Sequence, residues 1–366
     1  MREDGRISLW QFFVLVLAFL IGSSTLIMPI GQARQDAWLA YLLAGVMGLI
    51  AAYFFTTLGR RFPGETPLQY TPRVLGRWLG GLFNLAYLCY SFFLAGLVLF
   101  NIAELYVEVV LPLTPPLVIV GTLTGLAAWS VRLGLEVLGR MAEFLVPLIV
   151  LGITALTALT FMTPGIVHLD FLLPVMERGP LPVLQGAYET FVFPFGEMVV
   201  FLVLIPFVTR PQESLKPFSA AIILATLFTA IAIVRNIVVL GVPELTRINF
   251  PSLIAVQLIS VGEFLTRLEP LIIFIWTFSV FLKLAIVYYV FTLGSAQFLK
   301  LKDYRFLALP VAVLLSFFSL TLFENTFQLF QFATRAYPFF FMPFYFIYPA
   351  VVLAVAAVRN IKGEGA

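Results

Sequence analysis

The sequence predicts an all-α membrane protein of ten spanning helices, built as an inverted repeat of five plus five helices in which helices 1 and 6 are broken. Three observations support this fold class: an apolar composition, charge-free runs of about twenty residues along the whole chain, and Pro/Gly interruptions at matching places in its two halves. We expect one integral membrane domain over residues 1–366, with the repeats at about 8–162 and 186–358.

Composition places most of the chain in lipid and argues against several classes of function. Of the 366 residues, 61% are hydrophobic and 11% are charged, whereas soluble domains carry about 25% charged residues. The net charge of +3 is small and the basic residues are scattered over short loops, which disfavours a nucleic-acid partner. One cysteine, Cys89, and one histidine, His168, allow neither an intrachain disulfide nor a histidine metal cluster. We therefore expect no metal and no cofactor.

Charge-free runs locate the expected spanning helices. They lie at about 8–30, 38–59, 80–111, 117–133, 141–162, 186–208, 217–241, 268–300, 305–323 and 335–358. The first run is too long for a signal peptide and lacks a small-residue cleavage site, so we interpret it as a retained span. If the N-terminus is cytoplasmic, fifteen of the 22 basic residues fall in inner segments and five in outer ones, which predicts that both termini are cytoplasmic.

Two outer connections are longer than the others. The segment 242–267 contains apolar residues at helical spacing but is too short to span, so an interfacial helix is expected there. The segment 168–186 is interrupted by Pro and Gly and is expected to form a surface loop with at most one short helix.

Helices 1 and 6 carry the interruptions. Pro removes a backbone donor and Gly weakens a helix, so both spans are expected to unwind near the middle of the membrane. Gly22 and Gly196 are 174 residues apart, and five helices per half orient the two halves oppositely. In such folds, half-helix ends bind a small polar or zwitterionic ligand; the alternative is a pair of kinks without a ligand. The expected ligand-binding residues are Gly22, Ser23, Ser24, Thr25, Phe193, Phe195, Gly196 and Glu197.

Ionisable residues inside the spans are the other candidates for function. A charge at the bilayer centre costs roughly 2.5–3.5 kcal/mol, so it normally faces a cavity or a partner. Lys283 lies mid-way along helix 8 and is expected to replace a coupling cation or to form a salt bridge; Glu197 is expected to bind an amino group, pair with Lys283 or carry a proton. Arg235 lies at the same depth as Glu104 and Glu108, which predicts a structural ion pair.

Four segments together resemble a known family. They are VRLGLEVLGRMAEFLVPL, LDFLLPVMERGPLPVLQGAYETFVFPFGE, LEPLIIFIWTFSVFLK and FENTFQLFQ. They resemble the spore germination permeases, the B subunits of bacterial nutrient germinant receptors, which belong to the amino acid–polyamine–organocation superfamily with its LeuT-like fold. The resemblance covers essentially the whole chain and is specific only in combination.

The resemblance implies a sensor in the inner membrane of the spore that assembles with an A subunit and a lipoprotein C subunit. It also implies a germinant ligand, often an amino acid, whose carboxylate meets the backbone at Gly22–Thr25 and whose amino group meets Phe193–Glu197. Two other functions fit the residues. One is a secondary amino acid transporter, with Glu197 or Lys283 as the candidate for proton coupling, and the other is a scaffold whose pocket is vestigial.

Overall fold

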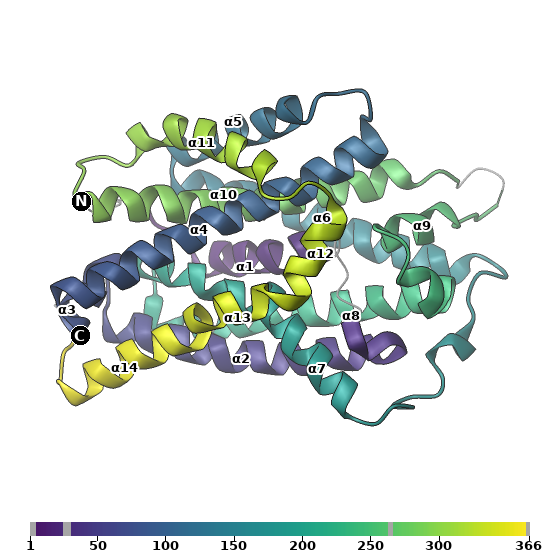
Figure 1. Ribbon diagram of the computed structural model, residues 1–366, viewed down its shortest axis with the longest axis horizontal. Coiled ribbons are helices and arrows are strands. Elements are labelled where there is room, and N and C mark those ends of the chain that lie inside the picture. Colours follow the sequence, from purple (N-terminus) through teal and green to yellow (C-terminus); the bar gives the residue numbers. More distant parts are fainter. Residues whose placement is uncertain (1–4, 25–30, 263–265, 364–366) are drawn as a thin grey trace.

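The computed structural model describes residues 5–24, 31–262 and 266–363 and forms an elongated bundle of helices (Figure 1). The α-helices are α1 (Leu9–Ser24), α2 (Ala37–Arg61), α3 (Pro67–Leu75), α4 (Arg77–Leu105), α5 (Pro116–Leu133), α6 (Leu135–Met162), α7 (Leu181–Thr190), α8 (Leu215–Leu245), α9 (Pro251–Gln257), α10 (Glu269–Phe298), α11 (Ala308–Thr321), α12 (Thr326–Arg335), α13 (Tyr337–Met342) and α14 (Tyr348–Val358). Short 3-10 or π segments include η1 (Gly31–Asp36), η2 (Tyr106–Val110), η3 (Leu169–Leu172), η4 (Phe191–Phe195), η5 (Gly196–Val203) and η9 (Pro343–Ile347).

The expected all-helical membrane fold is confirmed, but its helix count depends on how two segments are counted. Among the described residues, eight helices are long and apolar enough to cross a bilayer. A ninth candidate is the pair formed by Arg305–Thr321 and Thr326–Ala333, which bends by 95°. The expected first span is represented by the shorter apolar helix Leu9–Gly22. Ten spans result only if both of these segments are included.

Helix α1 lies at the centre of the bundle (Figure 1). It contacts α6, α8 and α10, and its residues from Val14 to Gly22 are all buried. A helix that is apolar on every side is stable only when other helices enclose it. The short α1 is therefore shielded from lipid by the longer helices, which places its C-terminal end deep inside the protein.

The two longest expected spans pack side by side. The third span, Arg77–Val110, consists of α4 and η2 and has 34 residues, and α10 has 30. Both exceed the roughly 20 residues that cross a bilayer at right angles, and they contact each other along the bundle. Helix α8, with 31 residues, is equally long, so length alone does not distinguish this pair, and the two repeats remain a prediction.

Both chain ends lie at the same end of the bundle (Figure 1). The backbone N–H of Ile7 donates to the Phe207 carbonyl at 3.0 Å, and that of Gly363 donates to the Arg61 carbonyl at 2.9 Å. An even number of spans requires this arrangement. The side of the membrane that they face remains a prediction from the distribution of basic residues.

Three short helices, α3, α9 and α12, lie in the connections between spans, and the sequence predicts only α9. Helix α9 is the helix expected in the segment 242–267. Helices α3 and α12 were not expected, although α3 begins with a capping box between Thr66 and Gln69, and the side chain of Asn325 caps α12 by accepting the Gln328 N–H at 3.0 Å. These cap residues were the sequence signal for both helices.

The close approach of α2 and α8 depends on Gly45. A Cβ atom at this position would lie 2.5 Å from Thr226 Oγ1 and 2.6 Å from Thr226 Cγ2. Glycine at helix–helix contacts permits this approach in membrane proteins.

The substitution Gly45→Ala should therefore lower the free energy of unfolding by about 1–3 kcal/mol, measured as thermal unfolding in detergent. Gly121→Ala is the matched control, because nothing lies within 4 Å of a Cβ at Gly121; equal loss in both variants would contradict this account.

Candidate functional site

The break of the sixth span is confirmed and lies against α1. Along this span the chain passes from α7 through the π segment η4 to the 3-10 segment η5, and Phe193 has non-helical dihedral angles (φ −131°, ψ 114°). Both η4 and η5 contact α1. Proline at 194 and glycine at 196 explain why the regular helix stops here. The two segments predicted to form the site are therefore neighbours.

The predicted residues on helix 1 are only partly described. Helix α1 ends at Ser24, whose Oγ donates to the Leu20 carbonyl at 2.5 Å. The backbone of Ser23 is helical, while Thr25 and any break of helix 1 beyond Ser24 lie outside the described residues.

Gly22 and Gly196 allow close packing. A Cβ atom at Gly22 would lie 2.8 Å from the Ser279 carbonyl oxygen on α10. One at Gly196 would overlap the ring of Tyr345. Both glycines are buried, so any larger residue would displace a neighbouring span. Gly22 therefore lets span 1 pack closely against span 8, and Gly196 lets span 6 pack closely against span 10.

A buried ion pair lies beside the break of span 6. Lys283 Nζ on α10 donates to Glu197 Oε2 on η5 at 2.5 Å, and the side chains are 0% and 1% exposed. The ammonium also lies 4.7 Å from the centroid of the Phe19 ring on α1 and 5.1 Å from that of Phe193 on η4. Cations are attracted to aromatic faces. Lys283 therefore interacts with spans 1 and 6 at once, and one of the pairings expected for Glu197 is formed.

A chain of tyrosine hydroxyls continues from the ion pair. Tyr337 on α13 donates to Glu197 Oε1; Tyr345 on η9 donates to Tyr337 Oη at 3.1 Å, and Tyr90 on α4 donates to Tyr345 Oη at 3.4 Å. All three tyrosines are buried. Sequence reasoning missed them, because nothing in their spacing distinguishes them from the other tyrosines of the chain. They extend the polar cluster to spans 3 and 10.

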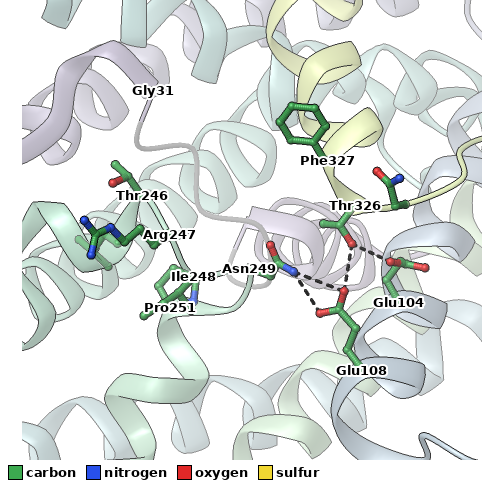
Figure 2. Close-up of a pocket in the computed structure, with 12 residues that line it drawn as sticks. Gly31, Glu104, Glu108, Thr246, Arg247, Ile248, Asn249, Pro251, Thr326 and Phe327 are labelled. Carbon is green, nitrogen blue, oxygen red and sulfur yellow. Dashed lines mark hydrogen bonds between the residues drawn. The ribbon is translucent and has the colours of Figure 1, made fainter.

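Glu104 and Glu108 line a cavity of about 610 Å³ (Figure 2). Thr326 Oγ1 donates to Glu104 Oε2 at 2.6 Å and to Glu108 Oε1 at 3.2 Å. Asn249 Nδ2 donates to both Glu108 oxygens, at 3.3 and 3.2 Å. These hydrogen bonds join span 3 to the start of α12 and to the loop before α9.

The expected ion pair of Arg235 with Glu104 or Glu108 is wrong. Arg235 is buried on α8 and donates through Nε and Nη2 to Asn236 Oδ1, at 3.1 and 2.9 Å, and no ion pair joins it to either glutamate in the part of the chain that the structure describes. Equal depth in the membrane does not fix the direction in which a side chain leaves its helix. Within the same residues, no group of three or more His, Cys, Asp or Glu side chains could hold a metal ion.

Two solved structures resemble this fold. One is Mhp1, a nucleobase-cation-symport-1 family transporter in a closed conformation with bromovinylhydantoin bound; the match has a TM-score of 0.59 at 14% identity and covers 91% of this chain and 76% of that one. The other is the substrate-bound outward-open state of a Na⁺-coupled sialic acid symporter, with a TM-score of 0.64 at 13% identity and coverage of 97% and 84%. At these identities the similarity shows a transporter fold alone.

Sequence comparison identifies the family. Spore germination protein KB of Bacillus subtilis (strain 168) is 30% identical over 364 residues, which cover 99% of this chain and 97% of the relative. The family described as "Spore germination protein" matches residues 6–327. The chain is thus a membrane protein without enzymatic character, and it belongs to the spore germination protein family.

Proposed function

We propose that this chain is the ligand-sensing membrane subunit of a spore germinant receptor. The observation that carries the proposal is the meeting of the break in span 6 with the buried end of α1 beside the Lys283–Glu197 pair. Irregular backbone inside a membrane is tolerated where it is enclosed by protein or lines a cavity, which is how transporter folds build their ligand sites. The ligand is a small germinant, such as an amino acid, and it binds between spans 1 and 6.

The surrounding contacts suggest how binding produces a signal. Glu197 connects η5 to Lys283 on α10 and to Tyr337 on α13. A ligand that binds beside Phe193 or Phe195 and shifts this segment must also shift the carboxylate and its two donors. Binding then favours one arrangement of spans 6, 8 and 10 over another, which is the condition for a conformational signal. We propose that the A and C subunits receive it at the spore inner membrane, with both termini of this chain cytoplasmic.

Lys283 carries a fixed positive charge into the region where spans 1, 6 and 8 meet. Its ammonium is held by one carboxylate and two aromatic faces. We propose that it takes the place of a bound coupling cation, so that ligand binding needs no sodium. The same arrangement leaves Glu197 little capacity for a ligand amino group, because both carboxylate oxygens already accept hydrogen bonds.

Secondary transport of amino acids is the second candidate function. It is favoured by the similarity of the fold to two transporters. A sensor and a transporter can share one ligand site and differ only in whether the ligand crosses the membrane. Measuring whether the ligand crosses the membrane, and not how tightly it binds, therefore distinguishes a sensor from a transporter.

Thermal stability in detergent tests the ligand site. A ligand that binds only the folded protein raises its apparent stability by about 2.7 kcal/mol at a hundred times the Kd, so we expect a saturable rise with one amino acid of a panel. Gly22→Leu should abolish it, because the added side chain collides with the Ser279 carbonyl and pushes α10 away from α1 at the site. Gly121→Leu, in open surroundings, should leave it unchanged. An unchanged shift in Gly22→Leu would remove spans 1 and 6 from the site.

Proteoliposomes separate sensing from transport. With this chain alone in the bilayer, we expect saturable binding of the labelled amino acid without its accumulation, and equal binding in sodium and potassium buffers. Accumulation above the level of empty liposomes would establish transport instead, and a requirement for sodium would contradict the role given to Lys283.

The ion pair gives a prediction about stability. Removing one partner leaves an uncompensated buried charge, so Lys283→Met or Glu197→Gln should each lower the free energy of unfolding by about 3–5 kcal/mol. The double variant Lys283→Met/Glu197→Gln should recover much of this loss, because neither charge remains. Thermal unfolding of the four proteins forms a double-mutant cycle; additive losses would show that the two residues act independently.

A further inference from the structure

The cavity shown in Figure 2 has an acidic side and an apolar side. Glu104 and Glu108 lie on one side of it, and Ile248 and Pro251 lie on the other (Figure 2). Phe327, which is 69% exposed, also lines it. A volume of about 610 Å³ is in the range of pockets that hold small molecules. The cavity therefore has the size and the mixed lining of a ligand site.

The two glutamates are not neutralised by a basic side chain. Neither forms an ion pair in the part of the chain that the structure describes. The side chains that donate to them, Thr326 and Asn249, are uncharged. A hydroxyl has one proton and an amide nitrogen has two, whereas each carboxylate can accept about four hydrogen bonds. Two negative charges thus line the cavity with unused capacity to accept.

Arg247 lines the cavity as well but does not compensate these charges. Its Nη1 lies 3.8 Å from Glu244 Oε1, and its side chain is 76% exposed. Figure 2 shows its guanidinium group directed away from Glu104 and Glu108. Water screens a charge that is so exposed. The two glutamates therefore determine the electrostatics of the cavity, which attracts a cation and repels a carboxylate.

An amide oxygen without a partner lies one helical turn from Glu104. Asn101 precedes Glu104 by three residues on α4, so both residues lie on the same face of that helix. Asn101 is 7% exposed, and its Oδ1 has no hydrogen-bond partner among the described residues. Buried acceptors are rarely left unpaired, because the loss of their bonds to water is costly. This oxygen and the two carboxylates together favour a ligand that donates hydrogen bonds.

We propose that this cavity binds a small organic ammonium ion. An ammonium group carries one positive charge and three N–H donors, which match the acceptors of Glu104 and Glu108. The apolar body of the ligand packs on Ile248 and Pro251, and the ring of Phe327 offers a face that attracts a cation.

The apolar side of the cavity favours an organic ion over a metal ion. A bare metal ion would leave that side without a contact, and among the described residues no group of three or more His, Cys, Asp or Glu side chains could hold one. The inference does not rest on the proposed ligand site between spans 1 and 6, since neither Lys283 nor Glu197 lines this cavity.

Thermal stability of the full-length protein in detergent tests the site, with butylammonium chloride as the probe and sodium chloride to hold the ionic strength constant. A compound that binds only the folded protein raises its apparent stability saturably. We expect this rise with butylammonium. Ammonium chloride, which lacks the apolar chain, should bind at least about tenfold more weakly, and sodium butyrate, which has the opposite charge, should give no shift.

Glu104→Gln and Glu108→Gln should each weaken butylammonium binding about tenfold, the effect of losing one hydrogen bond to a charged group. Glutamine keeps an oxygen that accepts from Thr326 or Asn249. Because two neighbouring negative charges repel each other, each variant without ligand should be as stable as the wild type or more so. A glutamate with a purely structural role would instead make the ligand-free protein less stable when replaced.

Glu324→Gln is the matched control. Glu324 lies two residues before Thr326 and accepts from Gln328 Nε2 at 3.0 Å, but it is not among the described residues that line the cavity. The control removes the same charge from the same loop, so butylammonium affinity should not change.

Several outcomes would overturn the inference. Equal weakening in Glu324→Gln and in the two cavity variants would show a diffuse effect of surface charge. Saturable stabilisation by potassium or calcium chloride that the cavity variants abolish would assign the glutamates to an inorganic cation. Equal stabilisation by butyrate would show that only the apolar chain binds. No shift with butylammonium, or lower ligand-free stability of both cavity variants with unchanged affinity, would leave the glutamates with a structural role.

Discussion

The constraint on which the site depends is the placement of two opposite charges in an interior with almost no water. Neither Lys283 nor Glu197 could remain charged there alone, so each fixes the position of the other. The two residues come from spans 8 and 6. Phe19 of span 1 and Tyr337 of span 10 contact the same pair. Four segments far apart in the chain must therefore meet in one arrangement. The glycines at positions 22 and 196 permit that meeting by leaving room for the backbone and rings that surround them.

Much of the architecture could be predicted from the sequence because a bilayer reduces the problem to length and polarity. Apolar runs located the spans, and proline at 194 with glycine at 196 located the break in span 6. The mid-span position of Lys283 predicted that it needs a partner, since it cannot reach water, and Glu197 was among the partners considered. Each of these inferences concerns position along a helix axis, which hydrophobicity and chain length determine directly.

The prediction that was wrong and the contacts that the sequence did not predict depend on rotation about the helix axis and on side-chain contacts between helices. Arg235 and Glu104 lie at similar depths, but Arg235 bonds to Asn236, and Glu104 bonds to Thr326 at the cavity. Depth can be counted from a sequence; the face that a residue presents depends on kinks such as the one at Gly241 (φ 71°) and on which helix packs alongside. For the same reason the hydroxyl chain through Tyr345 emerged only from the structure.

The ion pair also affects how this region of the protein responds to membrane potential. Moving one elementary charge through the field is worth about 2.3 kcal/mol per 100 mV, which exceeds many conformational energy differences. A rearrangement that carries Lys283 and Glu197 together moves no net charge and is indifferent to this field. One that separates them is favoured or opposed according to the direction of the potential. While the pair holds, the conformational equilibrium of this region is set by chemistry at the site and is the same in an energised cell as in one without a membrane potential.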